Sequence, residues 1–131
     1  MRKLVLFGYG NFGQAMLDSA LALGIEPDAD TFALDGTDIL EFRRNLDSIC
    51  NTVYNKDEIL LLCDSESGSM TQEACLVLEK RGLISKMILV AGISVPTVLA
   101  AIAWKDRITD STQLQNTLKA ESQSGLKFFG R

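Results

Sequence analysis

Short runs of apolar residues recur along this chain and alternate with longer stretches in which apolar residues repeat every three or four positions. The short runs are typical of buried strands, and the longer stretches are typical of helices with one buried side. The predicted strands cover residues 3–7, 31–34, 59–63 and 87–91. The predicted helices cover residues 11–23, 38–54, 69–80 and 96–104.

Each predicted strand is followed by a predicted helix, an order that favours a parallel sheet covered by helices on both faces. We therefore expect an α/β fold in which residues 1–131 form a single domain around an open, mainly parallel sheet. The last part of the chain predicts a weakly amphipathic helix that begins at Asp110 or Ser111, followed by a short C-terminal edge strand over Leu126–Phe129.

Three of the predicted helices begin with a residue pair that is typical of a capping box, a residue with a side-chain oxygen (Asn, Asp or Ser) followed three positions later by Glu or Gln. The pairs are Asn11 with Gln14, Asp38 with Glu41, and Ser69 with Gln72. The uncharged segment 87–104 approaches the length of a membrane span, but Gly92 and Pro96 interrupt it. We interpret this segment as a buried strand followed by a buried helix.

Composition limits the classes of function. The formal net charge is −4 and the basic residues are scattered, so we expect no nucleic-acid partner. The chain has three cysteines, Cys50, Cys63 and Cys75, and no histidine. Because each cysteine lies in an apolar segment, we expect buried free thiols. Without histidine, a structural zinc site would need more thiolates than the chain has, so we expect no metal site; we also expect no cofactor. Free thiols suit the reducing cytoplasm.

Three loops follow predicted strands and lead directly into helices: residues 8–11, 64–69 and 92–94. In parallel sheets ligands bind beyond the carboxyl ends of the strands, and a helix N-terminus favours an anion such as a phosphoryl group. The candidate anion-binding or partner-binding residues in these loops are Gly8, Gly10, Asn11, Ser67, Gly68 and Ser94.

The first loop also matches the dinucleotide-binding pattern Gly-x-Gly-x-x-Gly, with glycines at Gly8, Gly10 and Gly13. Asp35, at the end of the second predicted strand, stands near the position of a ribose-binding acid. A Rossmann-type dinucleotide-binding domain is therefore an alternative hypothesis. The motif is weak by itself, because any tight strand-to-helix turn favours glycine.

The chain as a whole resembles the IIA component of the mannose-family sugar phosphotransferase system (PTS). In that family the first strand ends in Thr-His-Gly, where residues 8–10 here are Gly-Tyr-Gly. After the third strand the family has Asp-x-x-Gly-Gly-Ser-Pro-x-Asn-x-Ala, and residues 64–74 here are Asp-Ser-Glu-Ser-Gly-Ser-Met-Thr-Gln-Glu-Ala. After the fourth strand the family has Ala-Gly-Val-Asn-Leu-Pro, and residues 91–96 are Ala-Gly-Ile-Ser-Val-Pro.

The resemblance implies a phosphoryl relay. The family's loop histidine takes a phosphoryl group from a small phosphocarrier protein and passes it to a IIB partner during sugar uptake. It also implies that Tyr9 stands at the acceptor position, that Asp64 corresponds to the group orienting the acceptor, and that Ser69 begins the adjacent helix. The family further implies a cytoplasmic protein without membrane insertion, either free or associated with a membrane transporter complex. It implies a homodimer that exchanges C-terminal strands.

Tyr9 departs from the family at the residue that carries the chemistry, and no other histidine can replace it. Ser67, Met70 and Gln72 depart from the family pattern beside it. Three hypotheses follow. The chain is a relay-deficient regulatory or structural subunit; or it is an active carrier that uses Tyr9, Asp64 or Cys63 as acceptor; or Tyr9 is an engineered change in an active protein.

Overall fold

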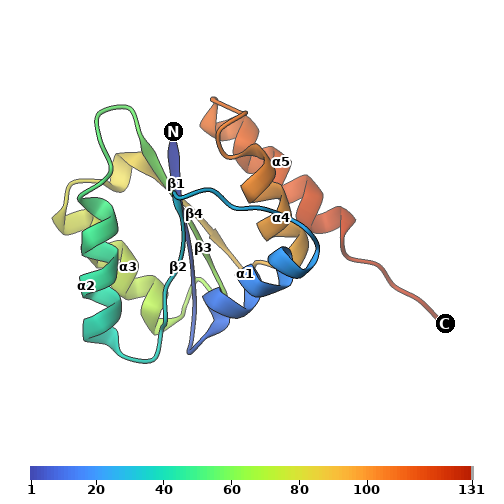
Figure 1. Cartoon of the computed structure of the whole chain (residues 1–131), viewed down its shortest axis with the longest axis horizontal. Helices are drawn as coiled ribbons and strands as arrows, with labels where there is room; N and C mark the ends of the chain where they lie inside the picture. Colours follow the sequence, from blue (N-terminus) through green and yellow to red (C-terminus); the bar gives the residue numbers. More distant parts are fainter. Residues whose placement is uncertain (131) are drawn as a thin grey trace.

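A four-stranded sheet lies between two layers of helices in the computed structural model, which describes residues 1–130 (Figure 1). The strands are β1 (Arg2–Phe7), β2 (Thr31–Ala33), β3 (Glu58–Cys63) and β4 (Met87–Ala91). They pair in the order β2-β1-β3-β4, and all three pairings are parallel. The predicted α/β class with an open parallel sheet is therefore confirmed.

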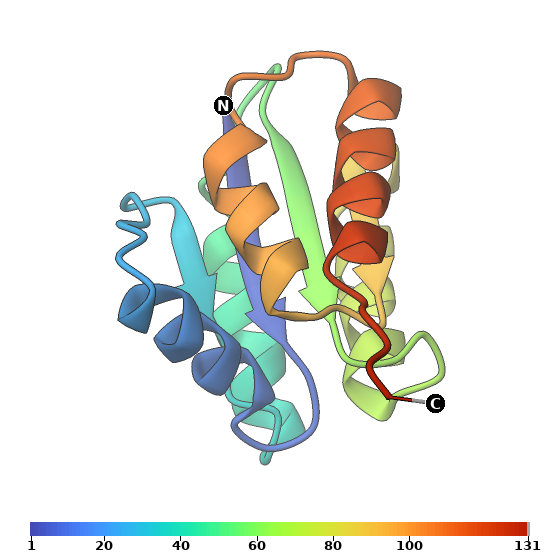
Figure 2. The same cartoon turned by 90° about the vertical axis from the view of Figure 1, so that its right-hand side faces the viewer.

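Helices cover both faces of the sheet, as expected (Figures 1 and 2). The helices are α1 (Phe12–Ala22), α2 (Ile39–Cys50), α3 (Ser69–Lys80), α4 (Val95–Trp104) and α5 (Ser111–Ser124), with a short 3₁₀ helix, η1 (Ile84–Lys86), before β4. The helices α2 and α3 pack on one face, and α1, α4 and α5 pack on the other.

The two central strands are fully covered. Residues 4–7 of β1 and 59–63 of β3 have no exposed surface, and their side chains alternate between the two hydrophobic clusters. This double coverage explains why both strands read as continuous apolar runs rather than as alternating patterns. Cys50 and Cys63 are buried, whereas Cys75 is half-buried, so the expectation of three buried thiols is correct for two of them.

Segment 87–104 forms β4 and then α4, which confirms the interpretation as a strand followed by a helix. Gly92 separates the two elements with a positive φ of 71°, and Pro96 lies in the first turn of α4. Within residues 1–130, no helix combines the length and the apolar character that a membrane crossing needs.

Only one of the three predicted caps forms. Asp38 accepts hydrogen bonds from the backbone N–H of Leu40 and Glu41, at 2.9 and 3.3 Å. Asn11 forms no cap because its backbone (φ −93°, ψ 19°) lacks the extended conformation that aims a side chain at the helix. Ser69 is already inside α3, and Gly68 occupies the cap position. The capping-box predictions at Asn11 and Ser69 are therefore wrong.

The predicted C-terminal edge strand over Leu126–Phe129 is also wrong. These residues form no strand and leave the end of α5 as an irregular tail directed away from the body of the molecule (Figure 1). A strand is stabilised by pairing with a neighbour, and the tail does not run beside the sheet of its own chain. Phe128 and Phe129 are consequently 89% and 93% exposed.

A cluster of charged residues around the buried Lys105 stabilises the edge of the sheet at which the strands begin. The Lys105 side chain is 1% exposed, and its ammonium donates hydrogen bonds to the Arg2 carbonyl (3.1 Å), Asp28 Oδ2 (2.9 Å) and Asp106 Oδ2 (2.6 Å). Although partial burial raises the pKa of Asp28, the hydrogen bonds from Lys105 and the Asp30 backbone outweigh it and hold that pKa below its usual value. The cluster joins the end of α4 to β1.

Replacing Lys105 with methionine should lower the free energy of unfolding at pH 7 by about 2 kcal/mol. The loss is smaller than for a fully buried pair because Asp28 and Asp106 reach solvent. The wild type should lose stability as the pH falls through the lowered pKa of Asp28, and Lys105→Met should show less of this loss. Urea unfolding at pH 7 and pH 3 measures both effects.

Lys119→Met, on the exposed side of α5, is the matched control and should leave stability and its pH dependence unchanged. Equal pH dependence in Lys105→Met and wild type would contradict the role given to this cluster.

Candidate functional site

Tyr9 and Asp64, which the sequence places in different loops, meet at the carboxyl edge of the sheet. The pairing of Phe7 with Cys63 aligns the ends of β1 and β3, so the residues that follow them are neighbours. The Tyr9 backbone N–H donates a hydrogen bond to Asp64 Oδ2 at 2.9 Å. The carboxylate therefore holds the backbone of residue 9.

Gly8 provides the space for this contact. A Cβ atom at Gly8 would lie 2.7 Å from Asp64 Cγ and 2.8 Å from a ring carbon of Phe12, which is closer than real side chains approach. Gly10 has a positive φ of 61°, a conformation that glycine adopts without strain. Both candidate glycines thus have a structural reason that does not require a ligand.

Gly36, which follows β2, packs against the loop of residues 8–10. Its N–H donates to the Gly10 carbonyl at 2.8 Å, and the two glycines form an isolated antiparallel bridge. A Cβ at Gly36 would lie 1.7 Å from the Gly8 carbonyl oxygen. The sequence pointed to Asp35 only as a candidate ribose-binding acid and gave no functional role to Gly36. The Asp35 carboxylate accepts a hydrogen bond from Thr37 N at 2.7 Å, and hydrogen bonding to Thr37 lowers the pKa of Asp35.

The side chain of Tyr9 contributes nothing to packing. It is 83% exposed, and the phenol oxygen forms no hydrogen bond with another residue among 1–130. A ring that filled a former phosphate pocket would be buried. The structure instead presents the phenol to solvent.

The second loop holds itself together before α3 begins. Ser65 carbonyl accepts from Thr71 Oγ1 at 2.6 Å, and Ser65 Oγ accepts from the Ser67 backbone N–H at 3.3 Å. Gly68 then starts α3 with an extended backbone and no side-chain cap. The first N–H groups of α3, at Ser69 and Met70, lack partners within the helix, which leaves a partial positive charge near Asp64.

The third loop, residues 92–94, begins α4 and takes no part in the contact between Tyr9 and Asp64. Ser94 and Thr97 form a capping box at the start of α4, and their hydroxyl oxygens lie 3.2 Å apart. The Ile93 N–H donates to the Cys63 carbonyl at 3.3 Å, which attaches this loop to the end of β3. The Ser94 hydroxyl is therefore occupied by α4, and Ser94 is not drawn into the Tyr9–Asp64 contact.

Cys63 is a poor candidate acceptor. Its side chain has no exposed surface, and the thiol faces the Ser65 carbonyl at 3.7 Å. Burial raises the pKa of the Cys63 thiol above its usual value, although hydrogen bonds to Thr71 and Ser65 partly oppose this. Because the thiolate is the reactive form of cysteine, a buried thiol with a raised pKa is unreactive.

The site thus consists of an exposed phenol, a carboxylate bound to the backbone beneath it, and the uncapped N-terminus of α3. This arrangement is able to receive an anionic or hydrogen-bonding group from a partner. It has no imidazole, because the chain contains no histidine.

The family model described as "PTS system fructose IIA component" (EIIA-man) matches residues 3–119. No curated protein has a sequence that matches this chain. The structure is similar to the PTS component EIIA from Streptococcus agalactiae, with a TM-score of 0.79 and 19% identity over 98% of this chain and 97% of that chain.

The fold is also similar to the mannose/sorbose-specific IIA subunit from Enterococcus faecalis, with a TM-score of 0.77 and 20% identity over 99% of this chain and 96% of that chain. A IIA protein associated with the fucose utilization operon of Streptococcus pneumoniae has a TM-score of 0.72 and 20% identity, over 97% and 92% of the two chains. At these identities the likeness concerns the fold.

Substituting Gly36 with alanine should destabilise the protein by about 2 kcal/mol, because the new Cβ collides with backbone atoms that cannot rotate away. The backbone amide resonance of Tyr9 should shift at the same time, since the Gly8–Gly10 loop has to move. Urea unfolding and amide NMR spectra measure the two effects.

Gly68→Ala is the matched control in the neighbouring loop. Its Cβ would meet its nearest neighbour, the Ser65 carbonyl oxygen, at an ordinary 3.5 Å, so the only expected loss is that of alanine at the cap position of α3, at most about 1 kcal/mol. Similar effects of the two substitutions would show that Gly36 has no special packing role.

Proposed function

This chain belongs to the PTS system fructose IIA component (EIIA-man) family, and we propose that it acts as a binding subunit that has lost the phosphoryl relay. The observation that carries the proposal is Tyr9, at the end of β1 where the family's acceptor histidine is expected, in a chain with no histidine. The loop of residue 9 is held by Asp64 and packed by its glycines, while the acceptor group is absent.

The chemistry of the acceptor supports this proposal. A relay residue has to accept a phosphoryl group and then release it to the next protein. A histidine phosphoramidate is labile and passes its phosphoryl group on, whereas a tyrosine phosphate is a stable ester. A phenol is also the weaker nucleophile at neutral pH. Even if Tyr9 accepted a phosphoryl group, it would be a poor onward donor.

The other two candidate acceptors are less accessible. Cys63 is buried, and burial raises the pKa of its thiol. Asp64 is half-buried and its Oδ2 is engaged by the Tyr9 backbone. An active carrier would therefore depend on the exposed phenol of Tyr9. An engineered change at Tyr9 alone would not account for Ser67, Met70 and Gln72, which also depart from the family pattern.

The dinucleotide-binding hypothesis receives no support from the glycine pattern. Gly8 and Gly10 are explained by loop geometry, and a Cβ at Gly13 would lie 2.3 Å from the Leu6 carbonyl oxygen. Gly13 thus lets α1 pack closely on β1. Close packing accounts for the pattern without a nucleotide.

For partners we propose a IIB-type component or another PTS protein, which would contact the exposed phenol of Tyr9 and the start of α3. In that role the chain would be a regulatory or structural subunit in the cytoplasm, free or associated with a membrane transporter complex. We also propose a homodimer. The exposed Phe128 and Phe129 and the unpaired outer edge of β4 support it, because both invite a second chain.

Incubation with a phosphorylated general phosphocarrier protein should leave the intact mass of this chain unchanged, because no histidine is available to accept the group. A stoichiometric gain of one phosphoryl group would overturn the relay-deficient role. Mapping the modified residue would then separate Tyr9 from Asp64 and Cys63.

Tyr9→His is the matched variant for this experiment. If it gains a phosphoryl group and the wild type does not, the defect lies at residue 9. If neither is modified, the neighbouring departures at Ser67, Met70 and Gln72 have also removed carrier recognition. Both outcomes agree with a relay-deficient wild type and tell the two causes apart.

The proposed dimer predicts twice the chain mass in light scattering coupled to gel filtration. Replacing Phe128 and Phe129 together with serine should shift the protein toward monomer, and the folded monomer itself should not be destabilised, since both side chains are exposed in the single chain. Replacing the exposed Leu23 with serine serves as a control. A monomeric wild type would rule out the dimer.

A further inference from the structure

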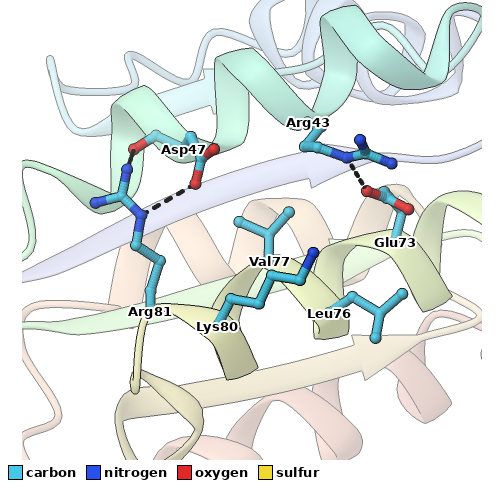
Figure 3. Close-up of a pocket in the computed structure, with 7 residues that line it drawn as sticks. All are labelled: Arg43, Asp47, Glu73, Leu76, Val77, Lys80 and Arg81. Atoms are coloured by element: carbon cyan, nitrogen blue, oxygen red, sulfur yellow. Dashed lines mark hydrogen bonds and ion pairs between the residues drawn. The ribbon is translucent and has the colours of Figure 1, made fainter.

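A groove with a volume of about 310 Å³ runs between α2 and α3, on the outer side of the face that these two helices cover (Figures 1 and 3). It is lined by Arg43, Asp47, Glu73, Leu76, Val77, Lys80 and Arg81. We call it the α2–α3 groove. None of these residues belongs to the Tyr9–Asp64 site.

Two ion pairs bridge the helices at the two ends of the groove (Figure 3). Arg43 Nε pairs with Glu73 Oε1 at one end, and Arg81 Nε pairs with Asp47 Oδ1 at 3.0 Å at the other. Arg81 is further held by Asn51 and by the Asp47 carbonyl. The carboxylates of Glu73 and Asp47 are therefore each neutralised by an arginine of the groove.

One positive charge remains among the described residues that line the groove, on Lys80, and the terminal nitrogens of Arg43 remain as unused hydrogen-bond donors. Within residues 1–130, Lys80 forms no ion pair, and Arg43 uses only Nε in its bond to Glu73. Between the two ion pairs lies Leu76, half exposed at 50% although it is apolar. The groove thus combines an open apolar contact with unused cationic donors, in a chain whose net charge is −4.

Helix geometry defines the spacing of these features. Glu73, which holds Arg43, and Lys80 are seven residues apart on α3, which is about two turns or 10 Å along the axis. Leu76 lies between them on the same side, at spacings of three and four residues. A second helix with carboxylates seven residues apart and an apolar side chain between them has the complementary pattern.

We propose that the α2–α3 groove docks an acidic amphipathic helix of a partner protein, with its apolar side chain on Leu76 and its carboxylates at Lys80 and Arg43. Charge complementarity selects this occupant, since the groove offers the unpaired ammonium of Lys80 and the unused guanidinium N–H donors of Arg43 beside an apolar side chain. A nucleic acid is disfavoured, because the chain is acidic overall and the described residues of the groove include one unpaired cation, Lys80, rather than a basic stripe.

This inference does not depend on the loss of the phosphoryl relay. The groove uses residues of α2 and α3 that do not contact Tyr9 or Asp64 in the structure. Failure of the relay-deficient role would leave the groove proposal intact, and the reverse also holds.

The test uses a fluorescent, side-chain-stapled helical peptide with Glu at positions i and i+7 and Leu at i+4, with binding followed by anisotropy at low salt. A peptide with Lys in place of both Glu residues is the charge control. The wild type should bind the acidic peptide and not the basic one. Lys80→Glu should weaken binding about tenfold or more, because an attraction becomes a repulsion.

Lys119→Glu, the same charge reversal on the exposed side of α5, should leave binding unchanged, and so should Tyr9→His. Leu76→Ser should weaken binding without changing its salt dependence. Amide NMR should place the peptide-induced shifts on Leu76, Val77 and Lys80 rather than on residues 8–11. The proposal is overturned if the wild type does not bind the acidic peptide, or if Lys119→Glu weakens binding as much as Lys80→Glu.

Discussion

The pairing of β1 with β3 is the constraint on which the rest of the structure depends. Both strands are buried on both faces and have polar residues at their ends, so a shift of their register would draw a residue such as Glu58 or Asp64 into the core. That register sets Phe7 opposite Cys63. The loops that follow these two residues, with Tyr9 in one and Asp64 in the other, therefore leave the sheet side by side. The site is thus a consequence of how the core packs.

The fold was predictable from the sequence where the signal was strong and local. Continuous apolar runs identified β1 and β3, and apolar residues at spacings of three and four identified α2. Asp38 was a correct cap because its backbone is extended, whereas Asn11 and Ser69 had suitable side chains on unsuitable backbones. A pattern of residue types does not reveal the φ and ψ angles of the residues in it.

The candidate site was predictable in its residues but not in its contacts. The position of Tyr9 and Asp64 at strand ends follows from the sequence, because parallel strands share a carboxyl edge. The role of Gly36 could not be found in this way, since it depends on contact with Gly8 and Gly10 from another loop. The same limit applies to the C-terminal tail, where strand-like composition does not provide a strand to pair with.

The backbone and the side chain of Tyr9 have separate roles. Its N–H holds Asp64 and so helps to fix the loop, while its side chain lies in solvent and supports nothing. A substitution here changes the chemistry that the protein offers and leaves the folding free energy almost untouched. Stability therefore places little constraint on which side chain stands at residue 9, so the chemistry presented at this edge of the sheet is free to change while the fold is kept.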